Sequence, residues 1–167
     1  VEETVFLSLI VLASGALLLF AARRPEETAE VLSDGWYNTG DMGYMDEDGY
    51  FHLSDRVKDM VVTGGENVFT TEVENAVMSH PAVQDVAVIG IPHPEWGEAV
   101  HAIVILHPGK HASEDELLSH CRERIAGYKL PKGFTFRDEP LPLSGAGKVL
   151  KTELRKPFWE GRERQVN

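Results

Sequence analysis

Two long apolar runs, residues 83–91 and 99–106, constrain the fold of this 167-residue chain more than any other feature. Both are rich in valine, isoleucine and alanine, and both have the length of strands rather than of helices. The residues between them, 92–97, include two prolines and a glycine, which are typical of a connecting turn. The two runs therefore predict two buried strands of a small sheet.

Two further segments, residues 71–74 and 113–116, each match a capping box, in which a threonine or serine begins a helix and a glutamate lies three residues later. Apolar residues recur at helical spacing behind each box, so each predicted helix has one buried face. The first helix is expected to end at His80-Pro81, because the residue before a proline disfavours helical backbone. Both helices are expected to pack on the sheet.

Shorter patterns complete the fold. They predict a helix over residues 25–32 and a hairpin over residues 44–53, whose turn is supplied by Asp-Glu-Asp-Gly. Short strands are predicted at residues 36–37, 60–62 and 134–136. Together these elements predict an α+β fold: a small mixed sheet with packed helices, preceded by a β-hairpin and an apolar N-terminal helix.

That apolar helix is predicted from residues 5–22, a run of 18 residues without a charge. As a helix it would be about 27 Å long, the lower limit for crossing a bilayer. Arg23 and Arg24 follow the run, so a spanning helix would leave the rest of the chain in the cytoplasm. A buried helix and a mistaken or truncated start of the sequence are the alternatives.

The charge of the chain is unevenly distributed. With 16 Lys and Arg against 27 Asp and Glu, the formal net charge is −11, which argues against general binding to nucleic acid. Residues 1–120 hold 5 basic and 21 acidic side chains, whereas residues 121–167 hold 11 basic and 6 acidic ones. The basic end could therefore meet a phosphate-bearing ligand.

Cysteine and histidine usage excludes two kinds of site. Cys121 is the only cysteine, so an internal disulfide and a zinc site of several cysteines are excluded, and a reduced, intracellular setting is favoured. The seven histidines show no spacing typical of metal ligands, so no metal site is expected within the chain.

Four polar clusters could carry chemistry. Asp41 follows Asn-Thr-Gly, where its carboxylate could accept the hydroxyls of a ribose or simply cap a turn. The segment 55–59 alternates in charge; it is either a solvated loop or a site in which Arg56 bonds a ribose or phosphate and Lys58 contacts a phosphate.

The other two clusters are rich in glycine. Gly64 and Gly65 would let the backbone approach a ligand closely, although most such pairs are turns. Residues 143–148 place Lys148 after a Gly-Ala-Gly sequence, which is either a flexible basic tail or a mobile loop whose lysine enters a site of developing negative charge. The sequence is not a Walker loop, because the first glycine and the final Ser/Thr are missing.

Taken together and in this order, the clusters resemble the end of the adenylate-forming acyl-CoA synthetases, the AMP-binding ligases. The likeness covers Arg24 to about Arg155. It is carried by GWYNTGDMGYMDEDGYFHLSDRVKDMVVTGGENVFTTEVENAVMSHPAVQDVAVIGIPHPEWGEAVHAIV, and LPLSGAGKVLKTELR is similar to the family's terminal lysine motif. The resemblance implies that an acid and ATP give an acyl-adenylate, which a thiol, usually coenzyme A, then attacks. A small C-terminal lid rotates between the two steps.

The same resemblance implies roles for particular residues. Asp41 and Arg56 would bind the nucleotide, Asp55 would be the hinge of the lid, and Lys148 would bridge the acyl carboxylate and the phosphate during adenylation. ATP, Mg²⁺ and coenzyme A are the implied cofactors, none of them bound tightly. The loop presented to coenzyme A would comprise Gly64, Gly65 and Glu66.

The resemblance also implies a division of the chain. Residues 1–23 are an unmatched apolar segment, residues 24–54 a remnant of the large adenylation domain and residues 55–167 the lid. The chain is expected to be inactive without the missing large domain, and whether it is an enzyme by itself stays open. A membrane-anchored, non-catalytic interaction module that uses the lid fold is the alternative, and a gene fragment without an independent role is a third.

Overall fold

The computed structural model describes residues 24–33 and 36–162. Its first compact unit extends to Gly40, and its second begins at Asp41. The apolar N-terminal helix and the candidate membrane span predicted at residues 5–22 lie outside the described residues. Within the described ranges, no helix is long and apolar enough to cross a bilayer.

The described part of the first unit, residues 24–33 and 36–40, contains one helix and two short strands. Helix α2 (Pro25–Val31) begins with a proline, which is favourable because the first N–H of a helix has no partner within it. Strands β1 (Leu32–Ser33) and β2 (Trp36–Tyr37) pair antiparallel. The predicted helix and the strand at 36–37 are confirmed.

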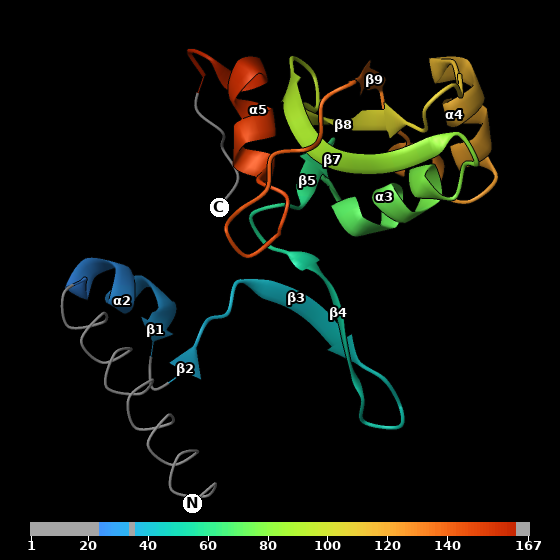
Figure 1. The fold of residues 1–167 in the computed structure, drawn as a ribbon. Helices are drawn as coiled ribbons and strands as arrows, with labels where there is room; N and C mark the ends of the chain where they lie inside the picture. The colour runs from blue at the N-terminus through green and yellow to red at the C-terminus, as the bar shows by residue number, and fades with distance from the viewer. Residues whose placement is uncertain (1–23, 34–35, 163–167) are drawn as a thin grey trace, which may run out of the picture. The chain divides into compact units, whose positions relative to one another are not determined.

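The second unit opens with a hairpin of β3 (Asp41–Met45) and β4 (Phe51–Arg56) (Figure 1). The carboxylate of Asp46 closes its turn by accepting the backbone N–H groups of Asp48 and Tyr50 at 3.1 and 2.9 Å. The predicted hairpin is confirmed, and its two strands extend further from the turn than the sequence indicated.

A five-stranded mixed sheet follows, in which β8 (Gly97–Leu106) has neighbours on both sides. It pairs antiparallel with β7 (Val83–His93) along nearly its whole length. Its other partners are β5 (Val61–Thr63), which is antiparallel, and β9 (Gly133–Phe136), which is parallel; β6 (Glu66–Val68) continues the sheet beyond β5. The small mixed sheet that the sequence predicted is confirmed.

Helices cover both faces of this sheet (Figure 1). Helices α3 (Thr70–Met78) and α4 (Glu114–Arg122) pack on one face. Helix α5 (Lys151–Trp159) packs on the other, and a 3-10 turn (Gly127–Lys129) precedes β9. Alternate residues of β7 enter the two cores because side chains alternate along a strand. The first core includes Val73, Val77, Val88, Val104 and Leu117; the second includes Ile89, Ile103, Leu141 and Leu154.

Two predictions about the helices differ in outcome. The capping box at 113–116 is confirmed: Ser113 Oγ accepts the N–H of Glu116 at 3.2 Å, and Glu116 Oε2 accepts the N–H of Ser113 at 2.8 Å. The box at 71–74 is wrong, because α3 begins at Thr70 and no side chain of its N-cap residue, Phe69, bonds the helix. The carboxylate of Asp55, which is distant in the sequence, caps the helix instead.

The flexible-tail alternative for the end of the chain is also wrong, since residues 151–159 form α5. Pro157 and several charged residues weaken the helical pattern of this segment, so the sequence did not predict the helix. Leu154 anchors it in the second core at 4% exposure, and the indole N–H of Trp159 donates to the carbonyl of Gly90 at 3.0 Å. Tertiary contacts therefore stabilise a helix whose local signals are weak.

A buried histidine makes the stability of the second unit depend on pH. His101 on β8 is 6% exposed; its Nε2 lies 2.8 Å from Thr135 Oγ1, and its Nδ1 has no hydrogen-bond partner in the described residues. Burial lowers the pKa of His101 below its ordinary value, and the nearby Glu114 opposes that shift weakly. Folding therefore favours the neutral ring, since protonation would create a buried N–H without an acceptor.

The lowered pKa of His101 leads to the first prediction. The stabilising contribution of neutral His101 is fully present above its unfolded pKa of about 6.5 and is lost as the pH falls through the lower pKa of the folded state. Urea unfolding at pH 7.5 and 5.5 should show a larger loss of stability for the wild type than for His101→Gln. The exposed His111→Gln is the matched control and should lose as much as the wild type; equal losses for all three proteins would contradict the assignment.

Candidate functional site

Four of the residues singled out from the sequence line one open cleft of about 560 Å³: Asp41, Asp55, Arg56 and Lys148. Asp41 and Arg56 face each other across the hairpin of β3 and β4, whereas Lys148 comes from the segment before α5. The start of α3, part of β7 and the first turn of α5 complete the walls. The fold thus joins a carboxylate, a guanidinium and an ammonium that are far apart in the sequence.

Lys148 lies on a closed turn, which we call the lysine loop (residues 143–149). The N–H of Ser144 donates to the carbonyl of Lys148 at 2.7 Å, and the N–H of Lys148 donates to Ser144 Oγ at 3.1 Å. Gly147 has φ +74°, a left-handed conformation that favours glycine. A β-bridge joins the two ends of the loop. The Lys148 side chain is exposed, so its ammonium can meet a ligand in the cleft.

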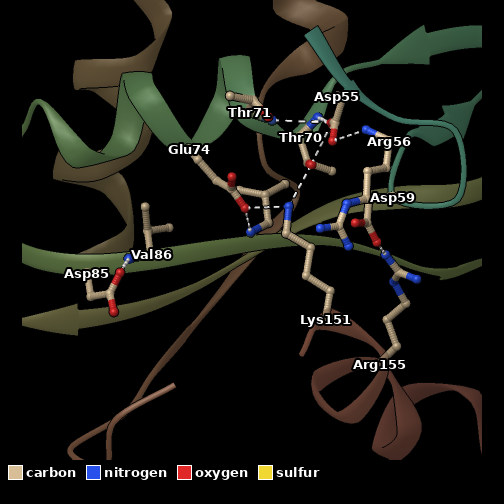
Figure 2. A network of polar contacts seen from close by, with 11 residues as sticks. Asp55, Arg56, Asp59, Thr70, Thr71, Glu74, Asp85, Val86, Lys151 and Arg155 are labelled. Carbon is tan, nitrogen blue, oxygen red and sulfur yellow. Dashed lines mark hydrogen bonds and ion pairs between the residues drawn. The ribbon is translucent and has the colours of Figure 1, made fainter. Parts of the chain in front are cut away.

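Asp55 is the residue that caps α3 (Figure 2). Its Oδ2 accepts the N–H of Thr70 at 2.5 Å, the Thr70 hydroxyl at 2.7 Å and the N–H of Thr71 at 3.4 Å. Its Oδ1 accepts the N–H of Arg56 at 2.8 Å. A carboxylate at this position satisfies N–H groups that have no partner within the helix and complements the positive end of the helix dipole. The predicted hinge residue is thereby bonded to the start of α3.

Lys151 follows the predicted lysine cluster, but the sequence assigned it no role of its own; it links α5 to the same network (Figure 2). Its Nζ donates to the Thr70 hydroxyl at 2.7 Å and lies 2.7 Å from Glu74 Oε1. The same Glu74 oxygen accepts the backbone N–H of Val88 at 2.8 Å. Burial raises the pKa of Glu74, and Lys151 opposes that shift through its charge and its hydrogen bond.

A second ion pair from α5 reaches the turn that follows β4. Arg155 Nη2 lies 2.5 Å from Asp59 Oδ1, and the two side chains are only 9% and 13% exposed. The turn itself is closed by the N–H of Asp59, which donates to the carbonyl of Arg56 at 3.0 Å. Lys151 and Arg155 are one helical turn apart, so one face of α5 contacts Asp59 directly and reaches Asp55 through the hydroxyl of Thr70.

The predicted coenzyme A loop lies in a different cleft of about 220 Å³. Its lining residues are Thr63, Gly64, Glu66, Trp96, Tyr128 and Lys132.

Two aromatic rings and a lysine shape this second cleft. The N–H of Gly64 donates to the carbonyl of Trp96 at 3.0 Å, which fixes the glycine turn beside the indole. His93 stacks on Trp96 with 4.1 Å between ring centroids, and Lys132 Nζ lies 5.0 Å from the centre of the indole ring. The cleft therefore offers an aromatic surface and a positive charge next to an open backbone turn.

Gly64 and Gly65 form the turn between β5 and β6, with φ +59° and +87°. Both values lie in the left-handed region that favours glycine. The break predicted there is thus a hairpin turn, and β6 after it was not predicted. No described residue lines both clefts. Sequence patterns did not indicate Trp96 or Lys132, because the fold alone brings them to the glycine turn.

The described residues do not fit a resident metal ion. In the part of the chain that the structure describes, no three His, Cys, Asp or Glu side chains are grouped closely enough to hold one. Within the larger cleft, Asp55 is engaged by Thr70 and Thr71, and Glu74 by Lys151. These two carboxylates are therefore already engaged within the chain.

Comparisons with known proteins show which proteins this chain resembles. Residues 72–148 match the family described as "AMP-binding enzyme C-terminal domain". A feruloyl-CoA synthase from Amycolatopsis sp is 52% identical over 135 residues, which cover 81% of this chain and 27% of that protein. The long-chain-fatty-acid–CoA ligase of Bacillus subtilis is 49% identical over 131 residues, which cover 78% of this chain and 23% of the ligase.

Solved structures show the same likeness. The structure of ATP-bound MatB from Rhodopseudomonas palustris has a TM-score of 0.76 to this chain and is 38% identical to it, over 84% of this chain and 28% of MatB. The o-succinylbenzoate CoA synthetase of Bacillus subtilis, in complex with its acyl-adenylate, has a TM-score of 0.70 and 40% identity, covering 75% of this chain and 25% of its own. The chain therefore spans about a quarter of the length of the proteins it matches.

Proposed function

Because residues 72–148 belong to the AMP-binding enzyme C-terminal domain family, we propose that the chain supplies the lid of an acid–thiol ligase. This ligase forms an acyl-adenylate from ATP and a carboxylic acid and then transfers the acyl group to coenzyme A. The observation that carries the proposal is the meeting of Asp41, Arg56 and Lys148 in one cleft, with Gly64 and Glu66 in another. Two clefts suit a reaction of two steps.

The larger cleft serves adenylation. The Asp41 carboxylate accepts hydrogen bonds from the ribose hydroxyls, and the Arg56 guanidinium donates to the nucleotide. An oxygen of the substrate carboxylate attacks the α-phosphorus, and the bond to pyrophosphate breaks. The Lys148 ammonium stabilises the negative charge that develops between carboxylate and phosphate, without forming a covalent bond.

The smaller cleft serves the thiol. Gly64 and Gly65 carry no side chain, so the pantetheine arm of coenzyme A can pass close to their backbone. The thiolate attacks the acyl carbonyl carbon, and AMP leaves with the bonding electrons. Lys132 beside Trp96 provides a positive charge for the phosphates of coenzyme A.

Rotation of the lid at Asp55 brings first the larger cleft and then the smaller cleft to the same bound substrate. In this proposal residues 24–54 are the last part of the adenylation domain and residues 55–167 are the lid. The acyl pocket and the remaining nucleotide contacts come from the large part of an adenylation domain, which is also where the acyl substrate is selected. The proposed setting of the reaction is the cytoplasm, which contains both ATP and coenzyme A.

The experiment is isotope exchange between ATP and pyrophosphate. Residues 24–167 are joined to the adenylation domain of the Amycolatopsis feruloyl-CoA synthase in place of that enzyme's own C-terminal part, and ferulate is the acid. The chimera should catalyse exchange and then form the thioester when coenzyme A is added, whereas the chain alone should catalyse neither step. A folded chimera without exchange, or equal exchange by the chain alone, would refute the proposal.

A further inference from the structure

We infer that Lys151 is a positioning residue that couples the lysine loop to Asp55 through the hydroxyl of Thr70. The contacts themselves are structural facts of the chain, and only their catalytic consequence rests on the proposed function. Lys151 begins α5 directly after the lysine loop, so its position is fixed relative to Lys148. Its side chain is 12% exposed, and its ammonium reaches across the cleft to α3.

The Thr70 hydroxyl has one proton to donate and lone pairs that accept. It donates to Asp55 Oδ2 at 2.7 Å and accepts from Lys151 Nζ at 2.7 Å, and Thr70 is fully buried. The Thr70 side chain therefore joins Lys151 to Asp55. Glu74 already neutralises Lys151 at 2.7 Å, so the bond to Thr70 is not needed to balance its charge.

The same helix holds the far end of the segment 55–59. Arg155 lies one turn further along α5 and pairs with the carboxylate of Asp59, whose side chain is 13% exposed. Because Asp55 and Asp59 are thus both connected to α5, the position of Arg56 relative to the lysine loop is set by two contacts rather than by the backbone alone. When Asp55 turns away from Thr70, the hydroxyl loses its acceptor and Lys151 keeps only Glu74. Movement at Asp55 is thereby transmitted to the loop that carries Lys148.

Thr70→Val tests the coupling, with Thr70→Ser as its matched control. Valine has the shape of threonine but no hydroxyl, and it leaves the Lys151–Glu74 pair in place. In the full chain, amide hydrogen exchange followed by NMR should become about five-fold faster at Arg56 and Leu150 in Thr70→Val, the factor expected for the loss of one hydrogen bond. It should stay within about twofold of the wild type in Thr70→Ser.

The core amide of Val104 separates coupling from general destabilisation. If its exchange accelerates as much as that of Arg56 and Leu150, Thr70 acts only on overall stability and the inference is overturned. A double variant, Lys151→Met with Glu74→Gln, removes the cation without leaving a buried carboxylate unpaired. It should reproduce the effect of Thr70→Val at Arg56, and an unchanged Arg56 would equally overturn the inference.

Catalysis gives an independent readout in the chimera described above. Thr70→Val should lower kcat of adenylation about tenfold and leave KM for ATP unchanged, since Lys148 is misplaced in the transition state only. Thr70→Ser, which keeps the hydroxyl, should have the kcat of the wild type. Equal losses in adenylation and in thioester formation from added acyl-adenylate would contradict the inference. Full exchange activity in Lys148→Ala would instead refute the proposed function, while the hydrogen-exchange result would still decide the coupling.

Discussion

Lys148→Ala is expected to slow acyl-adenylate formation in the chimera by about 10²–10³-fold, the usual cost of removing one group that stabilises developing negative charge. The Lys148 side chain is exposed and its loop is closed by contacts of the backbone and of Ser144. The free energy of unfolding should therefore change by less than about 0.5 kcal/mol. ATP–pyrophosphate exchange measures the first effect and urea unfolding the second.

Two further measurements make the result for Lys148 specific. Thioester formation from supplied acyl-adenylate should persist, because that step uses the smaller cleft. Lys156→Ala is the matched control: this lysine belongs to the same basic end of the chain but pairs on the surface with Glu153 at 2.7 Å. If Lys156→Ala slows exchange as much as Lys148→Ala does, the basic end acts through its overall charge and Lys148 has no particular role.

Arg155→Met is expected to lower the free energy of unfolding by about 3–5 kcal/mol, because it leaves a buried charge without a partner. The carboxylate of Asp59 is 13% exposed and pairs with Arg155 at 2.5 Å. Lys156→Met is again a suitable control, since its partner Glu153 is 47% exposed. That exposed pair should contribute no more than about 0.5 kcal/mol.

A double variant distinguishes the charge of Asp59 from the packing of Arg155. Asp59→Asn removes the stranded charge, so Arg155→Met combined with Asp59→Asn should recover more than half of the stability lost by Arg155→Met alone. Urea unfolding of the four proteins at pH 7 gives the comparison. No recovery in the double variant would assign the loss to packing of the long Arg155 side chain instead.

Sequence reasoning succeeded where the determining contacts are local. The capping box at Ser113 spans four residues and forms as predicted, whereas the start of α3 depends on Asp55, which lies 15 residues before Thr70. Helix α5 is weakly signalled because Leu154 and Trp159 find their partners on β7 and in the second core. The two long apolar runs were enough to predict β7 and β8, and the α+β fold was predicted correctly, although β6 was missed.

The residues of the candidate site were likewise predicted only in part. The positions of Asp41, Arg56 and Lys148 came from a resemblance of motifs, and the structure places all of them along one cleft. Lys151 has no motif of its own, because its partners Thr70 and Glu74 lie about 80 residues earlier. Only the folded chain brings such residues together.

The contact between Glu74 and Val88 has a consequence for solubility. In the order β6-β5-β8-β7, strand β7 is an edge strand, whose outward N–H groups could pair with a strand of another molecule. Glu74 occupies the N–H of Val88 at 2.8 Å, and the Asp85 carboxylate occupies that of Val86 at 2.9 Å (Figure 2). Because two carboxylates already accept these N–H groups, the middle of this edge is less able to pair with a strand of another molecule and so to aggregate.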